Sequence, residues 1–139
     1  MNLFESLQHE TKISQIMNNN IITIDESVSS LNAAKMMEDT DVDSLIVLEH
    51  GCPIGIVTDR DFAIKITAHS YPVDTPVRRI MSSPLISIDS NSDLWEASDL
   101  MSSNKIRTLP VIDNDDVVGI ITVRDLMNHL IRNIKNNLN

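Results

Sequence analysis

The sequence contains little cysteine, few aromatic residues and no long apolar run. Cys52 is the only cysteine among 139 residues, so neither a disulfide nor a thiolate metal site is expected within one chain. The aromatic residues Phe4, Phe62, Tyr71 and Trp95 are too few to predict base-stacking platforms. No apolar stretch approaches the ~20 residues of a membrane span. The first ten residues lack the basic start and apolar run of a secretory signal.

The charge is strongly acidic and unevenly divided. A formal net charge of −9 argues against nucleic-acid binding, because neutralisation of phosphates by Lys and Arg supplies most of that affinity. Residues 1–70 carry 4 basic and 11 acidic side chains, whereas residues 71–139 carry 7 and 9. The second half is therefore better suited to meet a phosphate. The lone cysteine and the absent signal together predict a cytoplasmic protein without membrane insertion.

One stretch of the chain occurs twice. Residues 55–62 (GIVTDRDF) return as residues 119–126 (GIITVRDL), an offset of 119 − 55 = 64. Aligning residues 12–66 with residues 76–130 without a gap gives 14 identities in 55 positions. Random pairing at average composition gives roughly three or four. We conclude that the chain is a tandem duplication and that each half has the same fold.

Within each repeat the apolar pattern predicts a short helix followed by β-α-β-β-α. The chain divides into a leader (1–11), repeat 1 (12–69), a linker (70–75), repeat 2 (76–134) and a polar tail (135–139). The predicted strands are Ile21–Ile24, Ser44–Leu48 and Ile54–Val57, with Leu85–Ile88, Thr108–Ile112 and Val118–Ile121 as their counterparts. The second helix of each repeat has its apolar residues on one face, and the last helix starts at the duplicated motif.

The duplicated motif has the form of a strand that turns directly into a helix. Thr58 and Thr122 are good N-cap residues, and Asp61 and Asp125, three positions later, complete a capping-box pattern. A strand end beside a helix N-terminus also exposes N–H groups that suit an anion. Taken singly, such a Thr-x-x-Asp pattern is more often a cap than a ligand site, and the two uses are compatible.

The duplicated motifs, the Ile16-Met17 and Ile80-Met81 pairs, and the run Leu109–Asp113 resemble the CBS domain family. The resemblance covers about residues 12–131. It implies an α/β (α+β) fold in which two pseudo-symmetric repeats pack their sheets about a pseudo-dyad, the tandem arrangement called a Bateman module. It also implies two clefts for adenosine-containing ligands (AMP, ADP, ATP, S-adenosylmethionine or NAD) and a homodimer formed through helices.

The resemblance further implies roles for individual residues. Asp61 and Asp125 correspond to ribose contacts, and Thr58 and Thr122 to ribose or phosphate contacts. The remaining positions expected at the ligand are the adenine contacts Ile22, Thr23, Ile86 and Ser87, the phosphate contacts Arg60, Arg107 and Arg124, and Pro110 in the run before the second motif. Repeat 1 departs from the pattern, since Asp43 stands where repeat 2 has Arg107. The two clefts should therefore differ, and which cleft Arg107 serves stays open.

The function expected from these observations is regulatory rather than catalytic. The sequence contains no phosphate-binding Walker loop, nucleophile elbow or paired-carboxylate motif, and its four histidines lack the spacing of metal ligands. We expect no catalytic residue, no metal site and no cofactor beyond a regulatory adenine nucleotide whose level is signalled to an unidentified enzyme or transporter. The alternatives are a docking scaffold that binds no ligand, or a binder of S-adenosylmethionine or NAD.

Overall fold

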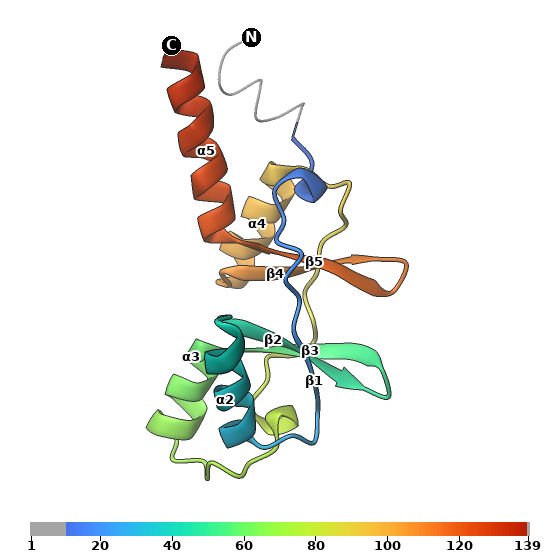
Figure 1. Ribbon diagram of the computed structural model, residues 1–139, viewed down its shortest axis with the longest axis vertical. Helices are drawn as coiled ribbons and strands as arrows, with labels where there is room; N and C mark the ends of the chain where they lie inside the picture. Colours follow the sequence, from blue (N-terminus) through green and yellow to red (C-terminus); the bar gives the residue numbers. More distant parts are fainter. Residues whose placement is uncertain (1–10, 139) are drawn as a thin grey trace. The chain divides into compact units, whose positions relative to one another are not determined.

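The computed structural model describes residues 11–138, which form two compact units (Figure 1). One unit contains Ile21–Ile86. The other contains Ser87 onwards together with the described residues up to Asn20. Each unit consists of a small sheet and helices, so the predicted mixed α/β fold class is confirmed.

The unit of Ile21–Ile86 has a three-stranded sheet in the order β1-β2-β3. Strand β1 (Thr23–Asp25) runs parallel to β2 (Ser44–Glu49), and β2 is antiparallel to β3 (Cys52–Thr58). Helix α2 (Ser30–Thr40) starts where the Ser29 side chain accepts a hydrogen bond from the Asn32 N–H at 3.1 Å. The last helix starts as α3 (Asp59–Asp61) and continues as the π-helical segment η2 (Phe62–Ala68).

The other unit repeats this order with one strand missing. Helix α4 (Leu94–Asn104) is followed by the antiparallel strands β4 (Thr108–Asp113) and β5 (Asp116–Thr122), and then by α5 (Val123–Leu138). The predicted strand Leu85–Ile88 is reduced to a single bridge between Ile88 and Val111. That prediction was wrong, and Pro110 explains why.

Pro110 occupies the position that Ile46 occupies in the first repeat. The Ile46 N–H donates a hydrogen bond to the Ile22 carbonyl at 3.0 Å, which starts the pairing between β1 and β2. Proline has no N–H, so the corresponding bond to Ile86 cannot form. The next bond survives, because the Ile88 N–H still reaches the Pro110 carbonyl at 3.0 Å.

The last helices also differ from the prediction. Helix α5 runs through Leu138, so residues 135–138, predicted as a polar tail, are helical. The predicted leader lies almost entirely outside the described residues. No helix among residues 11–138 is both long enough and apolar enough to cross a bilayer.

Each repeat begins with a short arm that packs in the unit built on the other repeat. Arm 1 (residues 12–20) and arm 2 (residues 76–84) precede the first strand position of repeats 1 and 2, and contain the short helices η1 (Ile13–Gln15) and η3 (Val77–Arg79). Arm 2 belongs to the unit built on repeat 1, where Val77 and Ile80 are fully buried. Arm 1 belongs to the unit built on repeat 2, where Ile13 is fully buried.

Each arm lies against a glycine in the third strand of the sheet that it covers. Ser82 pairs with Ile56 beside Gly55, and Asn18 pairs with Ile120 beside Gly119. A Cβ atom on Gly55 would lie 2.7 Å from the Met81 sulfur and 2.9 Å from the Ser82 carbonyl oxygen. At Gly55 the backbone of arm 2 passes too close for a side chain, whereas at Gly119 it is mainly the Met17 side chain of arm 1 that occupies the space.

The two glycines yield the first prediction. We expect Gly55→Ala to lower the free energy of unfolding by about 1–3 kcal/mol, because an overpacked side chain must displace the Ser82 backbone. Gly119→Ala should cost less, because its Cβ meets mainly the flexible Met17 side chain and lies 3.3 Å from the Asn18 carbonyl. Urea unfolding of both variants checks this, and equal losses would contradict the explanation.

Candidate functional site

The predicted capping boxes are present at the start of both last helices. In the first repeat the Thr58 N–H donates to Asp61 Oδ2 at 2.9 Å. In the second repeat the Thr122 N–H donates to Asp125 Oδ2 at 2.9 Å, and the Asp125 N–H donates to Thr122 Oγ1 at 3.2 Å. Each aspartate therefore stabilises the corner at which a strand becomes a helix. The two carboxylates differ in what else they bind.

Both oxygens of Asp61 are occupied. Oδ1 lies 3.2 Å from Ser82 Oγ, which donates to it, and 3.5 Å from Lys65 Nζ. Lys65 is held in place by the Ile80 carbonyl, which accepts its hydrogen bond at 2.6 Å. Asp61 is only 7% exposed. The predicted ribose contact of repeat 1 thus connects its own helix to arm 2, and no acceptor is left for a ligand in this arrangement.

Asp125 uses only one of its oxygens. Oδ2 accepts from Thr122 N–H and Oγ1, both at 2.9 Å, while Oδ1 has no hydrogen-bond partner among residues 11–138. The side chains at the positions of Lys65 and Ser82 are His129 and Asn18. Asp125 is also half-buried, whereas Asp61 is buried.

His129, at the position that corresponds to Lys65, is hydrogen-bonded to different partners. Its Nε2 atom is hydrogen-bonded to Thr11 Oγ1 at 3.2 Å and to Asn133 Nδ2 at 3.0 Å. Burial, together with the nearby Arg132, lowers the pKa of His129 below its ordinary value. The ring is therefore neutral at neutral pH, and it does not replace the positive charge that Lys65 brings to Asp61.

The basic residues gather at the corner of the second repeat. The Val123 N–H, the first of α5, donates to the Arg107 carbonyl at 3.0 Å. This bond places Arg107 beside the first turn of α5, which contains Arg124, so both arginines belong to the same corner. Both residues are exposed. Which cleft the Arg107 side chain serves stays a prediction, because this bond involves only its backbone carbonyl.

The corner of the first repeat has the opposite charge. The corresponding bond joins the Asp59 N–H to the Asp43 carbonyl at 3.3 Å. The turn contains Asp59, the buried Asp61 and one basic residue, Arg60, and the bond places the backbone of Asp43 beside it. Carboxylates a few ångströms from a phosphate repel it. The predicted difference between the two repeats is therefore present in their backbone neighbours.

The remaining predicted contacts are only partly brought together. Ile22 and Thr23 lie near the end of the sheet at which β3 finishes, because Thr23 pairs with Ile46 and Thr58 pairs with Ser44. Ser87 is exposed and precedes the Ile88 bridge to β4. Ile86 belongs to the other unit. Pro110 is fully buried in β4, so its side chain shapes the sheet rather than a ligand surface.

Sequence reasoning missed two features of the site. The first is the pair Lys65 and Ser82, whose hydrogen bonds to Asp61 depend on the packing of arm 2 and leave no local signal in the sequence. The second is an apolar groove between α4 and α5. Its signal was present in the spacing of Leu126 and Leu130 and in the replacement of Leu31 by Trp95 in the second repeat. Among the described residues, no three His, Cys, Asp or Glu side chains cluster as metal ligands.

A duplicated α/β unit with a capped strand-to-helix corner in each copy defines a tandem module of the kind predicted from the sequence. The family model for the CBS domain matches residues 13–67 and 77–132. The chain therefore belongs to the CBS domain family and carries two such domains.

Relatives and solved structures agree with this assignment. The CBS domain-containing protein YhcV of Bacillus subtilis is 34% identical over 116 residues, covering 84% of this chain and 83% of its own. The hexameric CBS-CP12 protein from bloom-forming cyanobacteria is 30% identical with a TM-score of 0.77, covering 84% of this chain and 69% of that one. The CBS domain pair of protein MJ0100, in complex with 5′-methylthioadenosine and S-adenosyl-L-methionine, is 27% identical with a TM-score of 0.78. It covers 86% of this chain and 94% of that one.

The unequal hydrogen bonding of the two aspartates yields the second prediction. We expect Asp61→Asn to lower the free energy of unfolding by about 1–3 kcal/mol, because an amide at this buried position leaves the Lys65 and Ser82 donors poorly matched. Asp125→Asn should cost less, since its one occupied oxygen can be replaced by the amide oxygen. Chemical unfolding of the two variants measures the difference, and a larger loss for Asp125→Asn would contradict it.

Proposed function

We propose that this chain is a regulatory CBS module, not an enzyme, that binds an adenosine-containing ligand at the corner formed by Thr122, Arg124, Asp125 and Arg107. The observation that carries the proposal is Oδ1 of Asp125, which has no hydrogen-bond partner among residues 11–138. An ionised carboxylate has only acceptors, and the neighbouring hydroxyls of a ribose offer two donors. Asp61 lacks this capacity, so we do not extend the proposal to the corner of repeat 1.

The charge of this corner favours a nucleotide over a nucleoside. Arg107 and Arg124 flank the first turn of α5, and guanidinium groups bind phosphate oxygens through two hydrogen bonds at once. The N-terminus of α5 adds a partial positive charge. The MJ0100 pair contains two adenosine compounds without phosphate, so adenosine recognition is the shared chemistry and the phosphate is what Arg107 and Arg124 add here.

The regulatory step that we propose is a shift between conformations. A ligand that orders the corner changes how α5 packs, and this biases a surface read by a partner enzyme or transporter, in a homodimer of the chain. The alternative, a docking scaffold that binds no ligand, predicts that substitutions at Asp125 leave every interaction of the protein unchanged.

Calorimetry provides the third prediction. We expect protein freed of co-purified small molecules to bind AMP, ADP, ATP or S-adenosylmethionine, and Asp125→Asn to weaken that binding by about tenfold or more through loss of a charge-assisted hydrogen bond. Asp61→Asn is the matched control, because it changes the corresponding residue of repeat 1 and should leave affinity unchanged in the folded protein. Absence of heat with all four ligands would disprove the proposal. Equal weakening by both variants would disprove the assignment to repeat 2.

The fourth prediction separates phosphate recognition from adenosine recognition. We expect Arg107→Ala to weaken binding of ATP and ADP while leaving binding of 5′-methylthioadenosine unchanged, because the latter offers no phosphate. Arg132→Ala is the control, since it removes an exposed arginine of α5 that lies two turns away from the corner. Equal effects of Arg107→Ala on both kinds of ligand would show that this residue does not contact a phosphate.

A further inference from the structure

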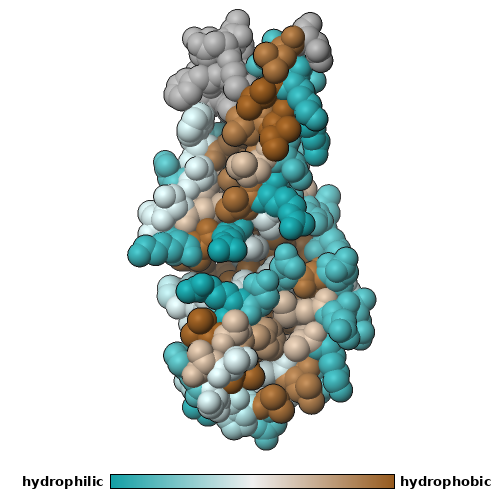
Figure 2. All heavy atoms as spheres, turned by 90° about the vertical axis from the view of Figure 1, so that its left-hand side faces the viewer, coloured by the Kyte–Doolittle hydropathy of each residue, from teal (hydrophilic) through white to brown (hydrophobic). Residues whose placement is uncertain are grey.

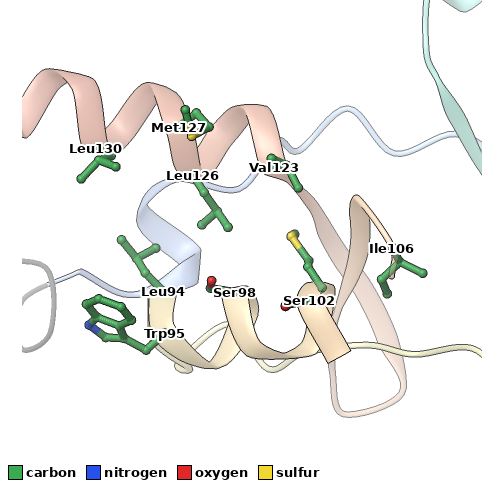
Figure 3. A pocket seen from close by; sticks show the side chains of 10 residues that line it. Leu94, Trp95, Ser98, Ser102, Ile106, Val123, Leu126, Met127 and Leu130 are labelled. Atoms are coloured by element: carbon green, nitrogen blue, oxygen red, sulfur yellow. The ribbon is translucent and has the colours of Figure 1, made fainter. Parts of the chain in front are cut away.

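An apolar groove of about 380 Å³ lies between α4 and α5, but it offers no charged partner to a nucleotide. Figure 3 shows Leu126 and Leu130 directed from α5 toward α4, and none of the ten residues that line the groove is charged. Figure 2 shows hydrophobic side chains gathered along α5, where Met127 and Ile131 are exposed. Such a surface suits contact with another protein, so an adenosine compound is expected at the two corners instead.

At the corner of repeat 1, two side chains of the same unit provide the donors that a ligand would bring. Asp61 Oδ1 accepts a hydrogen bond from Ser82 Oγ at 3.2 Å and lies 3.5 Å from Lys65 Nζ. A ribose bound here would offer the same carboxylate two hydroxyl donors. Lys65 and Ser82 therefore occupy the acceptor positions that those hydroxyl groups would need.

The ammonium group of Lys65 is held by three oxygen atoms. It donates to the Ile80 carbonyl at 2.6 Å and to the Met81 carbonyl at 3.4 Å, in addition to its ion pair with Asp61. A lysine ammonium has three donors, so each of them has an acceptor. The Lys65 side chain is only 28% exposed. A ligand that displaced it would leave a partly buried charge without these partners, which costs free energy.

The lysine has no equivalent at the corner of repeat 2. The offset of 64 residues places His129 at the position of Lys65, since 129 − 65 = 64. His129 Nε2 is hydrogen-bonded to Thr11 Oγ1 and Asn133 Nδ2. In the described part of the chain, its ring makes no hydrogen bond to Asp125.

The serine has no equivalent there either, although the backbone around it is the same. Asn18 corresponds to Ser82, since 82 − 18 = 64. The Ser82 N–H donates to the Ile56 carbonyl at 2.8 Å, and the Asn18 N–H donates to the Ile120 carbonyl at 2.7 Å. The Asn18 side chain instead accepts the Asn20 N–H at 2.7 Å. The two corners thus share a backbone and differ in the side chains directed at the aspartate.

We propose that Lys65 and Ser82 exclude a ligand from the corner of repeat 1, and so limit each chain to one adenosine compound, bound at Asp125. The inference rests on the proposed function for the ligand, and it adds the pair of residues that decides which repeat binds. With Lys and Ser at these two positions, the shared Thr-x-x-Asp motif is a helix cap alone. With His and Asn, the motif is a cap that can also accept a ligand.

Exchanging the pair between the repeats tests the proposal. Lys65→His/Ser82→Asn gives repeat 1 the residues of repeat 2. Calorimetry with 5′-methylthioadenosine should give one site per chain for the unaltered protein and two for this variant. Adding Asp61→Asn to the variant should remove the second site. The probe lacks a phosphate because repeat 1 has Asp43 where repeat 2 has Arg107, and an acidic residue there disfavours a phosphate.

The matched control is Lys35→His/Ser70→Asn, which makes the same two replacements at exposed positions of the same unit and should keep one site. Asparagine suits the left-handed backbone of Ser70, whose φ is 61°. Circular dichroism establishes that each variant is folded. If Lys65→His/Ser82→Asn does not fold, the reverse exchange His129→Lys/Asn18→Ser decides. It should weaken binding at Asp125 by about tenfold or more, and unchanged affinity overturns the proposal.

One site in the folded Lys65→His/Ser82→Asn variant, or two sites in the unaltered protein, overturns the proposal and leaves the site at Asp125 in place. Failure of the proposed function gives a different result, because the unaltered protein then binds no probe. In that case, binding by the variant that Asp61→Asn abolishes still supports the role of Lys65 and Ser82. Absence of binding by both proteins overturns both inferences.

Discussion

The corner at which the third strand becomes the last helix depends on a carboxylate that accepts the N–H of the preceding threonine. This single interaction, 2.9 Å long in both repeats, fixes the direction in which the helix leaves the sheet. The cost of leaving a helix N-terminus without acceptors explains why both copies keep Thr and Asp. The same geometry holds a negative charge at a surface where a ligand with hydroxyl donors can dock, so one residue serves both the fold and the proposed function.

Duplication gave the protein two such corners, and the residues around them then diverged. In the first repeat, Lys65 and Ser82 occupy the second oxygen of Asp61 and bury the side chain. In the second repeat, His129 is bonded to Thr11 and Asn133 instead, and one oxygen of Asp125 has no hydrogen-bond partner in the described part of the chain. Where the first repeat has Asp43, the second has Arg107, so the charge beside the start of the last helix is also more positive in the second repeat. One motif has thus given a structural corner and the corner that we propose to bind an anionic ligand.

The sequence allowed much of this to be predicted, because its strongest signals are local. The 64-residue offset and the apolar β-branched runs located the β2–β3 and β4–β5 hairpins, and the Thr-x-x-Asp pattern located both caps. The predictions that failed depend on distant partners. Proline at 110 removed a hydrogen bond to a residue 24 positions earlier, since 110 − 86 = 24, and so abolished a strand whose own sequence is favourable. The roles of Lys65 and Ser82 required knowledge of where arm 2 packs.

The exchange of arms shows that the unit of duplication is not the unit of folding. The core of the first unit contains Val77 and Ile80 from the second repeat, and the other unit contains Ile13 from the first. Gly55 and Gly119 are needed because each accommodates the arm of the other copy. A fragment cut at the repeat boundary, residues 12–69, lacks the side chains that close its own core, whereas residues 21–86 include them. Because neither repeat buries its apolar face alone, the duplication persists as a pair, and the two corners could diverge in charge without separating into independent domains.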